Sequence, residues 1–123
     1  MAMIAPTKIL QAVFYKSLSG KEPVRDWLMK LDKQDRKTIG EDIATLEFSW
    51  PVGKPKCSPI KGNTGLYEVR SNLSSGRTAR VLFVLIGSRM VLLHGFIKKT
   101  QKTPAKELKL AVTRMKEVQS HEK

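Results

Sequence analysis

A chain of 123 residues, of which 41% are hydrophobic, has enough apolar surface for one domain core, so we expect a single domain over residues 1–123. Its formal net charge of +12 favours a polyanionic partner such as nucleic acid and argues against an enzyme with an acidic surface. Its single cysteine, Cys57, excludes an intrachain disulfide and indicates a reducing compartment.

The positive charge is concentrated in the second half of the chain. Residues 61–123 hold thirteen Lys and Arg against four Asp and Glu, a net of +9, whereas residues 1–60 hold ten against seven, a net of +3. The start lacks the continuous apolar stretch of a signal peptide, and no segment approaches the ~18 apolar residues that cross a bilayer. We therefore expect a cytoplasmic protein with no membrane partner, whose residues 1–6 are flexible and lie outside the fold.

In chain order, the pattern first predicts a strand and then helical segments. Residues 8–16, KILQAVFYK, are apolar and rich in aromatic and β-branched types, which is typical of a strand. After the breaking segment SLSGKEP, Pro23 suits a first helical turn, and apolar residues then recur at helical spacing until LDKQD interrupts them. The pattern resumes beyond LDKQD, so we expect two short helices or one kinked pair.

From residue 50 onward, the sequence predicts an irregular loop, three strands and a final helix. Residues 50–63, WPVGKPKCSPIKGN, carry prolines and glycines among lysines, as loops do. The segments GLYEVRSN, RTARVLFVLI and RMVLLHGF follow, joined by SSG and GS, and predict an antiparallel meander. Residues 104–118 have apolar residues at helical spacing, with Thr103 as the expected N-cap and Pro104 as the first helical residue.

This order of elements predicts an α+β fold, with a small, mainly antiparallel sheet, two N-terminal helices and a C-terminal helix. We expect the helices to lie on one face of the sheet and leave the other face free. Alternation in GLYEVRSN places Glu68 and Arg70 on one face, and Arg80 opens the next strand. These arginines and the HGFIKK end of the last strand would then project from the free face.

The residues available for chemistry are mainly cations. The sequence has no CxxC pair, no HExxH motif and no glycine-rich phosphate loop, and acidic residues are too sparse in the basic half for a typical magnesium-dependent nuclease. We therefore expect neither a metal nor a cofactor. RNA offers a route without metal because its 2′-hydroxyl can attack the adjacent phosphate. The candidates are Arg70, Arg80 and Lys98 for catalysis, and Phe96, Lys99, Lys102, Arg77 and His94 for RNA binding.

Each candidate role has a structural alternative. Arginine binds phosphate oxygens bidentately, and crowding by like charges should lower the pKa of Lys98 so that it exchanges protons nearer neutral pH. The same cations can also form a solvated surface that only binds a partner. Phe96 can stack on an unpaired base or belong to the core, and His94 can be a partly buried, hydrogen-bonded residue rather than a catalyst.

Taken together, the segments GLYEVRS, RTARVLFVL, MVLLHGFIKKTQKTP and AKELKLA closely resemble the HigB-like, phage-derived branch of the RelE/ParE toxin superfamily, over about residues 8–118. The resemblance implies a RelE-like microbial ribonuclease fold and a toxin of a type II toxin–antitoxin system. It further implies metal-independent endoribonuclease activity on mRNA at the ribosome, which inhibits translation. The implied partner is a helix-turn-helix antitoxin in a hetero-oligomer.

The resemblance also implies residue roles. Arg70 and Arg80 match the positions that bind the scissile phosphate, and Phe96, Lys98 and Lys99 match an F-x-K-K segment assigned to base stacking, proton transfer and phosphate contact. No tyrosine follows Arg80, so Lys98 is the first choice for the general base and His94 the second. The alternative functions are a non-catalytic basic nucleic-acid-binding module and a ParE-type topoisomerase poison.

Overall fold

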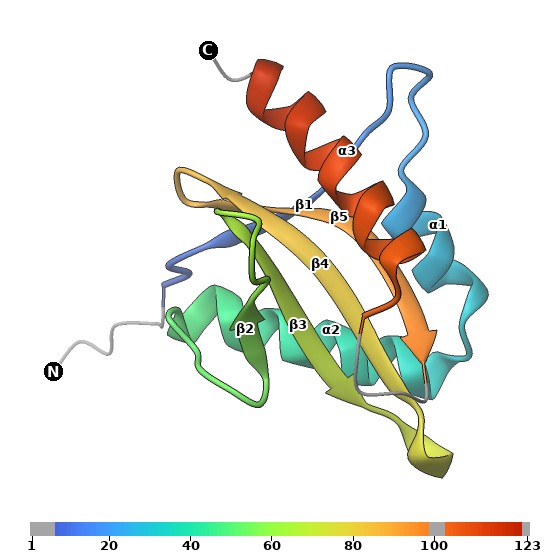
Figure 1. Ribbon diagram of the computed structural model, residues 1–123. Coiled ribbons are helices and arrows are strands. Elements are labelled where there is room, and N and C mark those ends of the chain that lie inside the picture. Colours follow the sequence, from blue (N-terminus) through green and yellow to red (C-terminus); the bar gives the residue numbers. More distant parts are fainter. Residues whose placement is uncertain (1–6, 99–102, 122–123) are drawn as a thin grey trace, which may run out of the picture.

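The computed structural model describes residues 7–98 and 103–121, which form a five-stranded sheet with helices on both faces (Figure 1). The expectation for residues 1–6 lies outside the described residues. The elements in chain order are β1 (Gln11–Phe14), α1 (Pro23–Lys30), α2 (Lys33–Ser49), β2 (Cys57–Pro59), β3 (Leu66–Asn72), the 3-10 helix η1 (Ser74–Gly76), β4 (Thr78–Ile86), β5 (Arg89–Lys98) and α3 (Ala105–His121).

The sheet has the strand order β1-β5-β4-β3-β2. Strands β2 to β5 pair in antiparallel fashion with their neighbours, and β1 pairs in parallel with β5. The predicted α+β class and the mainly antiparallel sheet are therefore confirmed. The parallel β1 edge joins the first strand of the chain to the last.

The two N-terminal helices form as separate elements because local chemistry divides them. Pro23 is the first residue of α1, where its missing N–H is not needed. The Asp32 side chain caps α2 by accepting a hydrogen bond of 2.8 Å from the Asp35 backbone N–H. This settles the choice between a kinked pair and two helices in favour of two.

Several boundaries differ from the sequence prediction, among them β1, which spans Gln11–Phe14 rather than residues 8–16. Residues 50–63 include β2, whose Cys57 and Pro59 lie opposite Val69 and Tyr67 of β3. Proline is tolerated in this strand because β2 is the edge of the sheet. Helix α3 runs from Ala105 to His121, and the Thr103 hydroxyl donates a hydrogen bond to Glu68 rather than serving as the predicted N-cap.

The expectation that one sheet face is free of helices is wrong. Helices α1 and α2 pack on one face, where Ile39 and Leu46 of α2 join Phe83 of β4 in one buried cluster. Helix α3 lies against the opposite face, where Ala111 and Met115 are buried in a second cluster (Figure 1). The physical reason is that β4 carries apolar side chains on both of its faces, so both faces are buried against helices.

Polar contacts fix α3 on the sheet as well as apolar ones. Arg114 donates a hydrogen bond of 2.8 Å to the Leu93 backbone carbonyl, and its guanidinium lies 5.4 Å from the centre of the Tyr15 ring. The Tyr15 hydroxyl in turn donates to the Glu117 carboxylate. These contacts tie α3 to both β5 and the chain after β1.

Gly95 marks the closest approach between β5 and α1. A Cβ atom built there would lie within 3.0 Å of the Trp27 ring. We expect Gly95→Ala to lower the free energy of unfolding by ~1–3 kcal/mol, as overpacked core positions do. Urea titration monitored by circular dichroism would measure the change.

Gly40→Ala is the matched control, because Gly40 lies within α2 and a Cβ atom there would meet nothing within 4 Å. This control should raise stability by up to ~1 kcal/mol through helix propensity. Equal stability of Gly95→Ala and the wild type would contradict the close packing of β5 against α1.

Candidate cationic site on the sheet

Four charged side chains lie on one sheet face because of strand register and alternation. Arg70 of β3 lies opposite Arg80 of β4, and Arg80 lies opposite Phe96 of β5. Residues two positions apart share a face, which places Glu68 beside Arg70 and Lys98 beyond Phe96 on the face that carries α3. We define the cationic site as Glu68, Arg70, Arg80, Lys98 and Thr103.

A buried ion pair lies at the centre of this site. Arg80 Nη1 donates to Glu68 Oε1, and the two side chains are only 7% and 6% exposed. Glu68 Oε2 accepts a second hydrogen bond, of 3.0 Å, from the Thr103 hydroxyl. Since Thr103 lies two residues before the start of α3, the carboxylate links the sheet to the segment that leads into that helix. Removing either charge of such a pair leaves the other buried without compensation.

Lys98 ends β5 within the same site. The residue is 8% exposed, and its buried Nζ makes no hydrogen bond within the described part of the chain. Burial lowers the pKa of the Lys98 ammonium, the charges of Arg80 and Arg70 lower it further, and the Glu68 carboxylate acts in the opposite direction. The direction agrees with the one expected from crowding, although burial is the larger cause.

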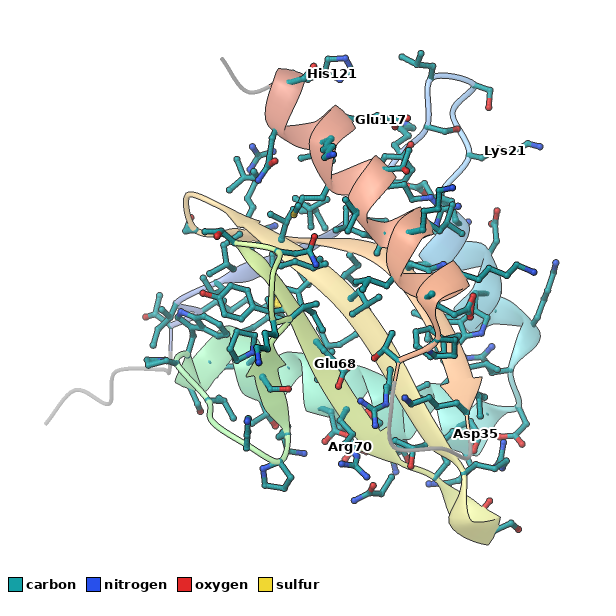
Figure 2. All side chains as sticks on the ribbon, in the orientation of Figure 1. Lys21, Asp35, Glu68, Arg70, Glu117 and His121 are labelled. Carbon is teal, nitrogen blue, oxygen red and sulfur yellow. The ribbon has the colours of Figure 1, made fainter. Side chains whose placement is uncertain are left out.

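Arg70 is the more accessible of the two arginines. Figure 2 shows it on β3 near Glu68, on the side of the sheet that carries α3. Its Nε is buried and has no hydrogen bond among the described residues, and the residue also lines a cleft of about 480 Å³ beside α2. Arg70 therefore belongs to both the cationic site and this cleft.

Of the residues predicted to bind RNA, Phe96, His94 and Arg77 make contacts within the fold. Phe96 is 7% exposed, and its ring stacks on His94 with ring centres 5.7 Å apart. His94 Nε2 lies 3.0 Å from Glu107 Oε1 of α3. The positions of Phe96 and His94 match their structural alternatives, a core residue and a hydrogen-bonded, partly buried one.

Arg77 joins the turn before β4 to α2. Its guanidinium donates two hydrogen bonds, of 2.8 and 3.1 Å, to the buried Asp35 carboxylate, and this bonding raises the pKa of Arg77. The contact occupies the planar fork that would otherwise bind phosphate. Lys99 and Lys102, also predicted to bind RNA, lie outside the described residues.

The sequence prediction missed two residues of the cationic site. Alternation places Glu68 on the same face as Arg70, but its partner is Arg80 on the next strand, and the identity of that partner depends on register. Thr103 was expected to cap α3. Its acceptor is instead a carboxylate 35 residues earlier in the chain, which no local pattern indicates.

Residues 7–98 and 103–121 show neither a metal-binding cluster nor a membrane-spanning helix. No group of three or more His, Cys, Asp or Glu side chains there is placed to hold a metal ion. None of the described helices is both long and apolar enough to span a membrane. Cys57 is buried, and burial raises the pKa of its thiol to about 11, so it is a poor nucleophile at neutral pH.

The lowered pKa of Lys98 predicts a pH-dependent stability difference. The charged form is disfavoured in the folded state, so this destabilisation is complete below the folded pKa and disappears as pH rises toward the ordinary value for lysine. Lys98→Met should therefore be more stable than the wild type at pH 7, and the difference should shrink toward pH 10. Denaturant midpoints of both proteins across this range would measure it.

Lys109→Met, on the exposed side of α3, serves as the control for the loss of one lysine charge. It should change the midpoint little at either pH, since surface charges contribute weakly. A Lys98→Met protein less stable than the wild type at pH 7 would contradict the environment described for Lys98.

Comparison with known proteins identifies the family. Residues 26–116, from within α1 to within α3, match the family described as Phage derived protein Gp49-like (DUF891). No curated protein matches the chain. The matched region covers more than half of the chain and includes every residue of the cationic site. The chain therefore belongs to the phage-derived Gp49-like family, which is a family of RelE/HigB-like toxins.

Proposed function

We propose that this protein is the toxin of a type II toxin–antitoxin system and a metal-independent endoribonuclease that cuts mRNA on the ribosome. Cleavage of the message would stop translation. The observation that carries the proposal is the meeting of Arg70, Arg80 and Lys98 on one face of three adjacent strands, with the pKa of Lys98 lowered. Membership of a toxin family supports the biological class, and the cationic site supports the chemistry.

The reaction begins with attack of the RNA 2′-oxygen on the adjacent phosphorus, as the 2′-hydroxyl loses its proton. The bond from phosphorus to the 5′-oxygen of the next nucleotide then breaks. The products are a 2′,3′-cyclic phosphate and a 5′-hydroxyl. Negative charge develops on the phosphate oxygens during this step, so groups that bind them more tightly in the transition state accelerate it.

Arg70 and Arg80 have the properties that this charge requires. A guanidinium stays protonated at any physiological pH and binds two phosphate oxygens with its planar fork. Arg70 is the more exposed member of the pair, and Glu68 fixes the orientation of Arg80. We assign Arg70 to direct contact with the scissile phosphate. We keep Arg80, which is buried beside Arg70, as a second positive charge that stabilises the same phosphate.

Lys98 is our choice for proton transfer. A lowered pKa favours the neutral amine, which can take the proton of the 2′-hydroxyl, and the ammonium so formed can pass this proton to the leaving 5′-oxygen. His94 was the alternative, but Glu107 and Arg114 of α3 flank its two ring nitrogens. We therefore assign His94 to holding α3 on the sheet.

The proposed inhibitor is a helix-turn-helix antitoxin, since a toxin family implies an antitoxin partner. A protein of net charge +12 favours a partner segment of opposite charge and rapid association at low salt. We propose that an acidic or amphipathic segment of the antitoxin covers the cationic site. A hetero-oligomer would then keep RNA away from Arg70 and Lys98.

Single substitutions should separate catalysis from RNA binding. Arg70→Lys keeps the charge but loses the planar fork, so cleavage should fall by ~10²–10³-fold while RNA affinity changes by less than ~1 kcal/mol. Arg80→Lys should behave alike, and Lys98→Ala should lower the rate by ~10²–10⁴-fold with a changed pH profile. Single-turnover cleavage of ribosome-bound mRNA would give these rates.

Lys106→Ala, on the exposed side of α3, is the control and should leave the chemical step unchanged. Circular dichroism would establish that each variant is folded. Equal, small losses for all four variants would contradict the assigned roles and favour a basic nucleic-acid-binding module without catalysis.

The chemistry of the products gives an independent check. Attack by the 2′-oxygen leaves a 2′,3′-cyclic phosphate or its hydrolysis product, a 3′-phosphate, and the proposed route assigns every step to protein side chains. We therefore expect cleavage to continue in excess EDTA, with ribosomes kept intact by polyamines. End labelling and mass spectrometry would identify the termini, and 3′-hydroxyl ends would exclude this mechanism.

A further inference from the structure

A polar cleft of about 480 Å³ lies next to the cationic site and has no role in the steps above. It is bounded by α2, by the loop before β2 and by the end of β3. Its volume lies within the ~300–1,000 Å³ typical of sites for small ligands. The lining residues are Thr38, Asp42, Pro55, Lys56, Arg70 and Asn72.

The walls of this cleft are held together by two contacts of one residue. The Lys56 ammonium bonds to Asp42 Oδ1 of α2, and the Lys56 backbone carbonyl accepts a hydrogen bond of 2.7 Å from the Arg70 backbone N–H. Lys56 therefore joins the helix wall to the strand wall. Arg70 in turn belongs to the cationic site as well, so the two sites have one residue in common.

The polar groups of the cleft suit the edge of a base better than a second phosphate. The Lys56 charge is already neutralised by Asp42, and a carboxylate in the wall repels an anion. No hydrogen bond from a described residue reaches Asp42 Oδ2, so this oxygen can accept one. Asn72 adds donors and an acceptor, whereas the Thr38 hydroxyl already donates its proton to the Gln34 backbone carbonyl. Unstacked bases of single-stranded RNA are recognised through such contacts to their edges.

We propose that this cleft receives the base of one nucleotide next to the cut, and that Asp42 selects bases whose edge presents an amino group. The inference rests on the proposed RNA cleavage. Arg70 would hold the phosphate while the base attached to the neighbouring sugar enters the cleft. Adenine, cytosine and guanine each carry an exocyclic amino group that can donate to Asp42, whereas uracil carries none. The base preference is then a property of α2 and the β2 loop, away from the reacting atoms.

The test uses messages that differ in a single base. Each RNA carries 2′-O-methyl groups except at one nucleotide, so that only one cut is possible, and the base on either side of this cut is varied. Rates are measured in single-turnover assays on free and ribosome-bound RNA. We expect at least one of the two positions to favour amino-bearing bases over uracil by about tenfold, the effect of one good polar contact.

Asp42→Asn should reduce this ratio to about one or below, since Lys56 keeps the amide oxygen and the amide N–H groups are left to donate to the carbonyls of uracil. Glu41→Gln is the matched control, because it removes the same charge from the neighbouring position of α2, and its side chain is exposed and lies outside the cleft. Glu41→Gln should keep the wild-type ratio. A ratio is informative here because a general loss of activity would lower all rates together.

The outcomes separate the two proposals. Wild-type cleavage with no base preference at either position, or a preference that Asp42→Asn retains, would overturn the role of the cleft and leave the ribonuclease proposal standing. Failure of the wild type to cut any RNA, free or ribosome-bound, would overturn the ribonuclease proposal and this inference with it. A preference lost in Asp42→Asn and kept in Glu41→Gln would support both.

Discussion

The buried ion pair between Glu68 and Arg80 is the contact on which the cationic site depends. The register of the sheet sets Arg70 directly opposite Arg80, and like charges in that relation destabilise a sheet. Lys98 adds a third positive charge to the same face. One carboxylate at the centre offsets part of this repulsion, and its second oxygen binds Thr103 at the start of α3. The cations can therefore gather on a packed sheet.

One sheet face serves both for packing and for the site, because α3 covers only part of it. Under the helix the face is apolar, with Leu82, Val84 and Leu93 fully buried. Phe96 and His94 lie at the boundary, and the charged residues lie beyond them. The contacts of Arg114 and Glu107 with β5 hold α3 at this boundary. A helix displaced further along the sheet would bury the site, and one displaced the other way would expose the core.

The parts of the structure that depend on local pattern were predictable from the sequence. Alternation within GLYEVRSN placed Glu68 and Arg70 on one face, and Pro23 marked the start of α1. The parts that depend on how distant segments pair were not. The β3–β4 register brings Glu68 into an ion pair with Arg80. The packing of α2 against the turn before β4 brings Arg77 into an ion pair with Asp35. Periodicity also identifies the apolar side of α3 without saying which sheet face it meets.

The parallel pairing of β1 with β5 has a consequence for how the protein is made. In the sheet, β5 lies between β1 and β4, so the first strand has no neighbour until nearly the whole chain has left the ribosome. Contacts so distant in sequence form late, since a long loop must close before they contribute. Lys98, at the end of β5, joins the arginines only at that stage. A nascent chain is therefore without its complete cationic site for most of its synthesis, and a product truncated before β5 lacks Lys98 and Thr103.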